Sequence, residues 1–398
     1  MTSSFSTIEF VIIGLQPWDI EIGSNCKNIA LELSQDFRVL YVNRALDRSS
    51  RIKYYRDQKV KNRLKAIRGK KSALELIKKN LWVYDPPVIL ESTGWIRSKR
   101  LFDFMSRLNS KRLAKSVMEA TSRLSFKNIV ILIDNDFYRG RYFKDYMPNV
   151  KTVYYIRDYL TEQPYFKKHG QRYEKYLIQE SDMVLANSTY LTGYASSYNK
   201  KSFYIGQGCD LSSFRGQVRN IPEDLKVINN PIIGYIGALL SSRLDISVIE
   251  YTAKENLDWN IVLVGPEDEG FVKSNLHNIP NIYFLGIKSK DEVPNYIANF
   301  DVCINPQAIN PSTIGNYPRK IDEYLAMGKP VVATATEAMS TFKKYVYLCD
   351  SKEEYLINIK RALNESKKSA MVDSRIELAF SHTWEDSVEK LKKYIFEE

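Results

Sequence analysis

Short, unbroken apolar runs recur along the chain, and each is followed by a polar loop and a longer segment compatible with a helix. The first half contains FVIIGL, RVLYVN, LWVYDPPVIL, NIVILID, TVYYIRD, MVLANS and SFYIGQG, and the second contains IIGYIG, NIVLVG, IYFLG, VCINP, PVVATA and VYLCD. Runs of Val, Ile, Leu and Tyr without polar alternation are typical of parallel strands buried on both faces. The pattern therefore predicts an α/β fold.

The length of 398 residues favours two such domains, because a single core rarely grows beyond about 250–300 residues. Residues 208–231 carry two glycines, two prolines and no sustained apolar periodicity, so we place the interdomain linker there. The expected fold class is two doubly wound, Rossmann-like domains. Ligands of such domains bind beyond the carboxyl ends of the strands, so we expect the two domains to face a central cleft.

Composition argues against several other classes of protein. The chain has 44% hydrophobic and 12% aromatic residues, which predicts a folded globular protein, and it has no run of 18 apolar residues. The N-terminal stretch MTSSFSTIEFVIIGL lacks the basic start and cleavage site of a signal peptide. The four cysteines and three histidines are widely scattered, so we expect no metal site and no disulfide framework. These features indicate a cytoplasmic location.

The segment NYPRKIDEYLAMGKPVVATA, residues 316–335, places a cation, a carboxylate and an apolar strand in a fixed order. A helix that begins after Pro318 presents Lys320 and Glu323 on one face, and Gly328 is typical of its end. A helix N-terminus with a lysine attracts phosphate, whereas a carboxylate accepts hydrogen bonds from ribose hydroxyls. The segment indicates a nucleoside-diphosphate site, with an ordinary surface ion pair as the alternative.

A second candidate feature is PIIGYIGALLSSRLD, in which a predicted strand ends at a glycine. Gly237 allows a backbone to approach a phosphate closely, and Arg243 is suited to clamp it. The spacing differs from the GxGxxG dinucleotide fingerprint, and a glycine after a strand is also common for structural reasons. Combined with Lys320 and Glu323 in the same predicted domain, these residues favour one shared site.

Taken in order, these motifs resemble the donor domain of GT-B glycosyltransferases, in particular the family 4-like group that includes bacterial polysaccharide transferases. The resemblance is carried by GYIGALLSSRLD, NIVLVGP, NIYFLG, DVCINP and PRKIDEYLAMGKPVVAT, and more loosely in the first half by VIIGLQPWDI, RVLYVN, SDMVLANSTYL and YIGQGCDLSSF. SHTWEDSVEKLKKYIF resembles the terminal helix of that group. The resemblance implies an acceptor-binding domain over 1–210, a donor-binding domain over 225–378 and a helix over 379–398 that crosses back to the first domain.

The same resemblance implies roles for individual residues. The donor site would consist of Gly237, Arg243, Gly286, Ile287, Asn316, Tyr317, Lys320 and Glu323. Lys320 and Arg243 would stabilise the departing diphosphate, Glu323 would bind the ribose, and the turn at Gly286 would read the base. Many relatives have a glutamate where this chain has Gly315 or Asn316, so Asn316 and Tyr317 are expected to offer neutral hydrogen bonds instead. No cofactor or metal is implied.

Residues of the first half complete the candidate site. Asp19, in QPWDIEIG, is the candidate base if the reaction inverts the anomeric centre, whereas a retaining reaction needs none. Asp158, in TVYYIRDYL, is a candidate catalytic residue beside Arg157, or else it caps the next element. Trp18 and Arg157 are expected on the acceptor or membrane side. The sequence leaves the choice between inversion and retention open.

Positive charge is concentrated in one stretch. Residues 44–115 contain 21 Lys and Arg and 6 Asp and Glu, a net charge of +15, whereas the whole chain is +11 and the remainder therefore −4. Cations mixed with aromatic residues suit an anionic membrane surface. The cations selected for this contact are Lys70, Lys71, Arg100 and Lys111. The alternatives are a solvated charged face, or nucleic-acid binding, for which no recognition motif is present.

The sequence thus predicts a glycosyltransferase that moves a sugar from a nucleoside-diphosphate sugar, most simply a UDP-sugar, to a lipid-linked glycan. We expect it to act peripherally at the inner face of the cell membrane, in cell-surface polysaccharide synthesis and without nucleic acid. Two alternatives stay open. One is a nucleotide-sugar 2-epimerase of the same fold, against which the few histidines argue. The other is a non-catalytic polysaccharide-assembly protein, which the missing glutamate favours.

Overall fold

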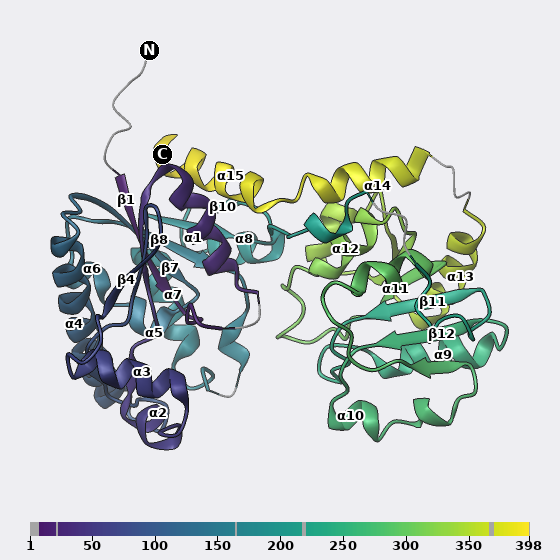
Figure 1. Ribbon diagram of the computed structural model, residues 1–398, viewed down its shortest axis with the longest axis horizontal. Coiled ribbons are helices and arrows are strands. Elements are labelled where there is room, and N and C mark those ends of the chain that lie inside the picture. Colours follow the sequence, from purple (N-terminus) through teal and green to yellow (C-terminus); the bar gives the residue numbers. More distant parts are fainter. Residues whose placement is uncertain (1–7, 21–22, 164, 217–219, 366–369, 398) are drawn as a thin grey trace, which may run out of the picture. The chain divides into compact units, whose positions relative to one another are not determined.

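The computed structural model describes residues 8–20, 23–163, 165–216, 220–365 and 370–397 (Figure 1). The chain divides into two compact units. Unit 1 comprises residues 1–206 and 387–398, and unit 2 comprises residues 207–386. Each unit has its own predominantly parallel sheet with helices packed on it.

Unit 1 is built on an eight-stranded sheet in the order β10-β9-β8-β7-β1-β2-β5-β4. Its strands, with the short separate pair β3 and β6, are β1 (Ile8–Gly14), β2 (Arg38–Val42), β3 (Leu46–Asp47), β4 (Leu74–Lys78), β5 (Leu81–Tyr84), β6 (Ile89–Leu90), β7 (Asn128–Asp134), β8 (Lys151–Ile156), β9 (Met183–Ala186) and β10 (Ser202–Tyr204). The central strand β1 pairs in parallel with β2 and β7, so that Phe10 lies opposite Val39 on one side and Val130 on the other.

Alternate residues of β1 enter opposite layers, as the two-residue period of a strand requires. Val11 and Ile13 pack in the core cluster that also holds Leu113 and Val117 of α4. On the other face, the ring of Phe10 contacts that of Phe37, just beyond α1. The described helices of this unit are α1 (Asn25–Asp36), α2 (Arg48–Lys53), α3 (Gln58–Ile67), α4 (Lys99–Arg123), α5 (Phe137–Gly140), α6 (Phe143–Tyr146), α7 (Gly170–Glu180) and α8 (Thr189–Ser196), with a 3-10 turn η1 (Leu160–Glu162).

Unit 2 has a six-stranded, fully parallel sheet in the order β13-β12-β11-β14-β15-β16. Its strands are β11 (Ile232–Ile236), β12 (Asn260–Val264), β13 (Ile282–Phe284), β14 (Val302–Asn305), β15 (Val331–Thr334) and β16 (Tyr347–Cys349). Val262 and Val264 face the layer that contains α12, whereas Ile261 and Leu263 face the layer that contains α9. The sheet is therefore buried on both faces, as its unbroken apolar runs predict.

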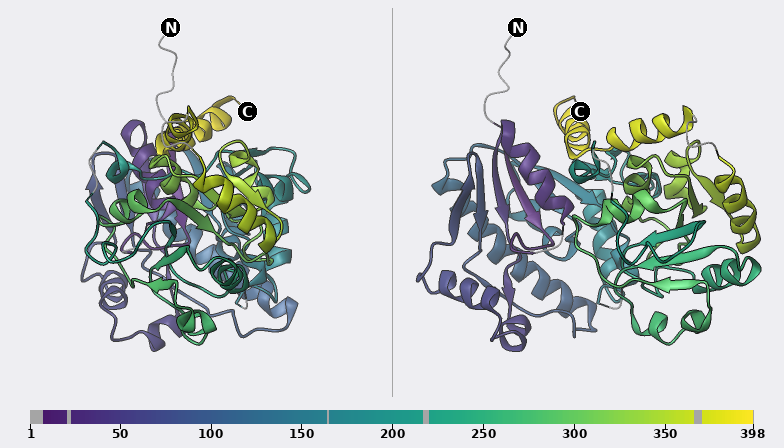
Figure 2. Two further views of the ribbon diagram at one scale, coloured as in Figure 1. Left: turned by 90° about the vertical axis from the view of Figure 1, so that its right-hand side faces the viewer. Right: turned by 45° about the vertical axis from the view of Figure 1, so that its right-hand side comes forward.

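The helices of unit 2 fill these two layers. They are α9 (Ile246–Glu255), α10 (Glu269–Val272), α11 (Val293–Asn299), α12 (Arg319–Ala326), α13 (Lys352–Leu363) and α14 (Ala370–Phe380), with 3-10 turns η2 (Ser212–Phe214), η3 (Asn275–Asn278) and η4 (Glu337–Phe342). The yellow helix α14 packs against α12 (Figure 2). The segment predicted as a linker contributes Cys209, Leu211 and Leu225 to the core of this unit.

The last helix, α15 (Trp384–Glu397), begins in unit 2, and its residues from 387 onward belong to unit 1. Within unit 1 the ring of Tyr394 stacks on Phe203 with centroids 4.2 Å apart. Lys151 donates a hydrogen bond to the carbonyl oxygen of Ile395, and Lys392 pairs with Asp36. The C-terminal residues are thus anchored on the sheet that the N-terminal residues begin.

The predicted strands are confirmed with three differences, of which the smallest is the unpredicted two-residue strand β3. The run LWVYDPPVIL is interrupted by two prolines, so that only β5 joins the large sheet and β6 pairs with β3 instead. Strand β4 was not predicted, because its charged segment has no buried face; it pairs antiparallel with β5 at the sheet edge, with Leu76 and Ile77 exposed. Among the described helices, none has the length and apolar character needed to cross a membrane.

Candidate functional site

A small polar pocket of about 180 Å³ lies in unit 2, beyond the carboxyl ends of β11 and β14. These two strands are neighbours in the sheet, although two others separate them in the sequence, so the connections leave β11 in opposite directions. This reversal is where doubly wound folds bind ligands. Four of the residues predicted from the sequence to bind the donor line this pocket: Arg243, Asn316, Tyr317 and Lys320.

Lys320 lies in the first turn of α12, which begins at Arg319 directly after Pro318. Its side chain crosses the backbone of Gly237, since a Cβ on that glycine would lie 2.0 Å from Cε and 2.3 Å from Nζ of the lysine. The ammonium also lies 5.6 Å from the ring centroid of Tyr235. Burial lowers the pKa of Lys320, and the charge of Glu323 opposes that shift. Gly237 has φ +143, a conformation that favours glycine.

Glu323 follows one turn later on α12, with part of its side chain buried. Burial raises the pKa of Glu323, and the Lys320 ammonium acts in the opposite direction. Within the part of the chain that the structure describes, Lys320 and Glu323 form no salt bridge with each other or with any other group. They are therefore not an ordinary surface ion pair, and both charges stay available to a ligand.

Arg243 and Asn316 bring further polar groups to the pocket. Arg243 lies just before α9, where its carbonyl oxygen accepts a hydrogen bond from the backbone N–H of Ala308. Its guanidinium, which is exposed, has no salt-bridge partner in the described ranges. The side-chain oxygen Oδ1 of Asn316 is buried and has no hydrogen-bond donor among the described residues. The pocket thus combines two cations with an unsatisfied acceptor.

Tyr317 lines the same pocket with its ring, but its hydroxyl points into a buried network. That hydroxyl donates to Oδ2 of Asp322 at 2.9 Å, and Nδ1 of His382 lies 2.7 Å from Oδ1 of the same carboxylate. The thiol of Cys209 lies 3.2 Å from Oδ2. Sequence reasoning missed Asp322 and His382, because they lie 60 residues apart and only the fold brings them together.

Gly286 and Ile287 follow β13, at the carboxyl end of a strand on the edge of the same sheet. Gly286 has φ +67, and a Cβ there would meet no atom within 4 Å. Ile287 is 74% exposed. Neither residue lines the pocket, so the structure places the predicted base-reading turn outside it.

Part of the chain is similar in sequence to known proteins, and its fold is similar to that of solved structures. Residues 230–365 match the model of the family described as glycosyl transferases group 1. This segment, about a third of the chain, is similar to the group 1 glycosyl transferases. The matched segment contains the whole pocket of unit 2, including β11, α12 and the residues between them.

A curated relative of this chain is TuaH of Bacillus subtilis strain 168, named as a teichuronic acid biosynthesis glycosyltransferase. The two chains are 26% identical over 232 residues, which is 55% of this chain and 57% of TuaH. The chain therefore spans little more than half the length of the curated relative that it matches.

Two solved structures match nearly the whole chain. HepE of Anabaena, in complex with UDP, is 17% identical, has a TM-score of 0.65, and covers 98% of this chain and 100% of its own. Sucrose-phosphate synthase of Thermosynechococcus elongatus is 14% identical, with a TM-score of 0.64 and 98% coverage of each chain. At these identities the likeness shows the fold alone, which is the GT-B arrangement of two parallel α/β domains.

In unit 1, Asp19 and Asp158 each have a guanidinium partner. Oδ1 of Asp19 lies 2.8 Å from Arg63, which also approaches Asp85 at 3.5 Å. Asp158 lies 2.7 Å from Arg157. Both carboxylates are partly exposed, so each can still meet a substrate, but as a member of an ion pair.

Arg157 is the centre of a buried cluster. Its guanidinium lies 2.8 Å from Asp134, whose side chain is completely buried, as well as near Asp158. Burial lowers the pKa of Arg157, but the two carboxylates outweigh that effect and raise it. A side chain that is only 11% exposed cannot reach a membrane surface, so of the roles predicted for Arg157 only that toward the acceptor remains.

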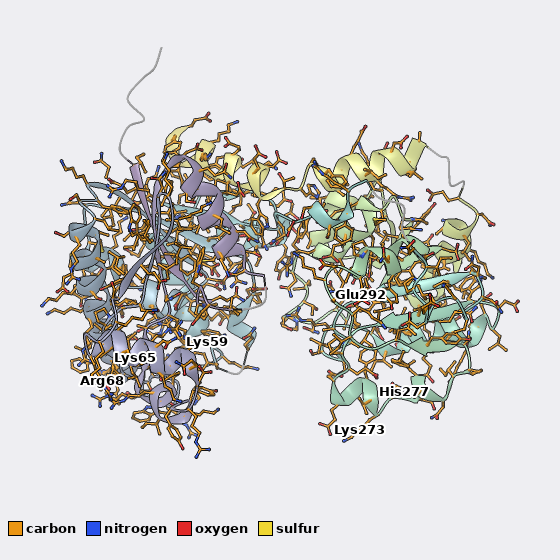
Figure 3. All side chains as sticks on the ribbon, in the orientation of Figure 1. Lys59, Lys65, Arg68, Lys273, His277 and Glu292 are labelled. Carbon is orange, nitrogen blue, oxygen red and sulfur yellow. The ribbon has the colours of Figure 1, made fainter. Side chains whose placement is uncertain are left out.

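Trp18 packs edge-on against Tyr41 with ring centroids 5.1 Å apart, and its backbone N–H donates to Asn43. The four cations selected for membrane contact, Lys70, Lys71, Arg100 and Lys111, are all exposed. Three further cations of the same basic stretch lie at α3 of the same unit: Lys59 and Lys65 are on the helix, and Arg68 is its C-cap (Figure 3).

Proposed function

We propose that this protein transfers a sugar from a nucleoside-diphosphate sugar, with UDP as the nucleotide, to a membrane-associated, lipid-linked glycan in cell-surface polysaccharide synthesis. The observation that carries the proposal is the convergence of Lys320 and Arg243 on one pocket, since neither has a carboxylate partner among the described residues. A diphosphate supplies the missing negative charge. HepE, which was crystallised with UDP and with UDP-glucose, supports the choice of nucleotide, and TuaH supports the pathway class.

In the reaction proposed, the bond between the sugar C1 and the β-phosphate oxygen breaks, and C1 bonds to an acceptor hydroxyl. Negative charge grows on the leaving phosphate as the bond breaks. Lys320 and Arg243 stabilise that charge more in the transition state than in the ground state, which accelerates the step. Because Lys320 is held over Gly237 before the ligand arrives, little reorganisation is needed.

The remaining donor contacts involve Asn316, which lines the pocket, and two residues of unit 2 that do not line it. We assign the ribose to Glu323, whose carboxylate has no other partner in the described part of unit 2, and the base to the backbone turn at Gly286. The resemblance to this family places Gly315 or Asn316 where many of its members have a glutamate. The unsatisfied Oδ1 of Asn316 accepts a hydrogen bond from a sugar hydroxyl, which replaces a charged contact by a neutral one.

The proton of the acceptor hydroxyl leaves as the new bond forms. If the reaction inverts, we assign it to Asp19, with Asp158 as the second carboxylate on the acceptor side; a retaining reaction passes it to the leaving phosphate. Each carboxylate forms an ion pair with an arginine, which fixes its position. We accordingly propose unit 1 as the acceptor-binding unit and unit 2 as the donor-binding unit.

The membrane part of the proposal rests on exposed apolar side chains beside exposed cations in unit 1. Phe104 and Leu101 of α4 are 64% and 39% exposed, close in the chain to Arg100. Exposed aromatic and basic residues together suit the interface of an anionic bilayer, where each cation contributes about 1 kcal/mol.

The test is calorimetric binding of UDP, GDP, ADP and CMP to the full chain and to Glu323→Ala. We expect selective binding of UDP that is lost in the variant. The matched control is Glu377→Ala, which removes an exposed carboxylate of α14 in the same unit and should leave UDP affinity unchanged.

A turnover assay separates the alternatives. UDP release that requires an added lipid-linked acceptor supports transfer. Conversion of a UDP-sugar without any acceptor identifies a 2-epimerase and overturns the proposal. No binding of any nucleotide overturns it as well, in favour of a non-catalytic assembly protein.

A further inference from the structure

A second cavity lies entirely within unit 1 and has a volume of about 820 Å³. It is lined by the loops that follow β1, β2, β7 and β8, so it lies at the carboxyl ends of four parallel strands. The chain connections leave β1 in opposite directions here, as they leave β11 in unit 2. Both its position and its volume are those of a ligand site.

The carboxylates that line this cavity are already engaged. Asp47 caps α2 by accepting from the backbone N–H and the hydroxyl of Ser50, and it also accepts from the hydroxyl of Ser92. Glu91 forms a salt bridge with Arg48 at 2.6 Å. These carboxylates therefore have no need of a cationic ligand.

The third carboxylate, Asp136, is buried and pairs with Arg139 while it caps α5. Arg44, which lines the cavity beside this pair, has no hydrogen bond or salt bridge from its side chain within the described ranges. The positive charge of Arg139, together with burial, lowers the pKa of Arg44. Asp47 and Asp136 also act electrostatically on Arg44, but neither forms a salt bridge with it among the described residues, so its N–H donors can bind an oxyanion.

Aromatic side chains form another part of the wall. Trp95 and Tyr165 line the cavity and are 69% and 50% exposed. Tyr165 lies against the backbone at Gly94, where a Cβ would come within 2.8 Å of its ring. Exposed aromatic faces next to polar groups are suited to the apolar faces of sugar rings, whose edges carry hydroxyls.

We propose that this cavity binds an acceptor sugar that carries an oxyanion, held by Arg44 and Arg139 while its ring packs against Trp95 or Tyr165. A planar guanidinium presents two parallel N–H donors, which match a carboxylate or a phosphate. This inference rests on the proposed function, because it names the substrate class of the acceptor for the same transfer.

The experiment measures binding of glucuronic acid, glucose 1-phosphate and glucose to the full chain by calorimetry or ligand-observed NMR. The first two probes separate a carboxylate on the sugar from a phosphate, and glucose is the neutral reference. We expect at least one anionic sugar to bind more tightly than glucose, with a preference that weakens as salt is added.

The variant is Arg44→Gln, which leaves no carboxylate without its partner and should therefore fold. We expect it to lose about tenfold in affinity for the anionic sugar, the value of one charged hydrogen-bonding group. The control is Arg51→Gln, which removes an equal charge from α2, seven residues further along the chain, at a position that does not line the cavity. It should bind the sugars as the parent protein does.

The outcomes distinguish the two proposals. Equal binding of glucose and both anionic sugars, or unchanged affinity in Arg44→Gln, overturns the acceptor inference even when UDP binds normally. Failure of the parent protein to bind UDP overturns the proposed function instead. If Arg44→Gln binds the anionic sugar more weakly while UDP affinity is equal in the parent, Arg44→Gln and Arg51→Gln proteins, the loss of sugar binding arises in the cavity of unit 1, as proposed.

Discussion

Lys320 passes over Gly237 so closely that a Cβ on the glycine would lie 2.0 Å from Cε of the lysine. The glycine therefore decides where the ammonium lies, although the two residues are far apart in the chain. Gly237 also takes φ +143, which side chains of L-residues rarely adopt.

We predict that Gly237→Ala lowers UDP affinity about tenfold or more, because the lysine must move away from the new methyl group. Calorimetry measures the affinity, and thermal unfolding measures the cost of the strained backbone. Gly216→Ala is the control, since Gly216 also has a positive φ, +67, but no atom lies within 4 Å of its Cβ position. An alanine at 237 that binds UDP normally would contradict the placement of Lys320 at the phosphate.

We predict that Lys320→Ala removes most transferase activity, with a loss of about a hundredfold in kcat, while the protein stays folded. The lysine forms no salt bridge within the described residues, so little stability depends on it. Lys273→Ala, which removes an exposed lysine of the same unit (Figure 3), should keep full activity. Activity at the parent level in Lys320→Ala would rule out the phosphate site.

The buried carboxylate of Asp322 fixes α12 through Tyr317 and His382, so we predict that Asp322→Asn destabilises the protein by about 3 kcal/mol. Denaturant unfolding measures this effect. The partly exposed pair of His277 and Glu267, 2.8 Å apart, is the comparison, and Glu267→Gln should cost no more than about 1 kcal/mol. Equal effects of the two substitutions would show that the network around Asp322 is not special.

Glu174 gives a pH dependence to stability. It is fully buried, and burial raises its pKa from 4.5 to about 7, although hydrogen bonds from Tyr154 and Tyr194 act in the opposite direction. The native state thus holds this proton more tightly than the unfolded chain does. Its contribution to stability is complete below pH 4.5 and is lost as the pH rises through 7.

We predict that Glu174→Gln, which cannot titrate, gains about 2 kcal/mol in free energy of unfolding relative to the parent between pH 5 and pH 8. Urea unfolding at the two pH values measures the change. Glu119→Gln, at an exposed position of α4, should show no such gain. A parallel pH dependence in the parent and Glu174→Gln proteins would refute the assignment.

The membrane proposal predicts reduced binding to anionic vesicles when four exposed cations of unit 1 are changed to glutamine. They are Lys70, Lys71, Arg100 and Lys111. Each contributes about 1 kcal/mol at such a surface, so co-sedimentation should fall by orders of magnitude while UDP affinity stays constant.

A matched set of exposed lysines in unit 2 provides the control for this loss of charge. They are Lys273, Lys343, Lys344 and Lys360. If both quadruple variants sediment equally with the vesicles, the basic stretch of unit 1 is a solvated face rather than a membrane surface.

The sequence contained most of the strand pattern and predicted four of the residues that line the small pocket of unit 2. Parallel strands read as continuous apolar runs, and Lys320 and Gly237 each carry a local signal, at a helix start and at a strand end. These signals are local because backbone geometry and burial act over a few residues. Strand β4 was missed for the same reason, since its pairing with β5 replaces a buried face that the segment lacks.

Only the tertiary structure decided which distant side chains meet. Nothing in the sequence signalled that Asp322, next to Glu323, forms a buried network. Its partner His382 is 60 residues away in the chain and reaches it only in the folded protein. Arg44 and Arg139 lie 95 residues apart in number, and they share a cavity because β2 and β7 flank β1 in the sheet. The sequence by itself determined the helices and strands and the charged residues that they carry. The order of the strands in the sheets determined which of those charged residues lie close together, because neighbouring strands can come from remote segments of the chain.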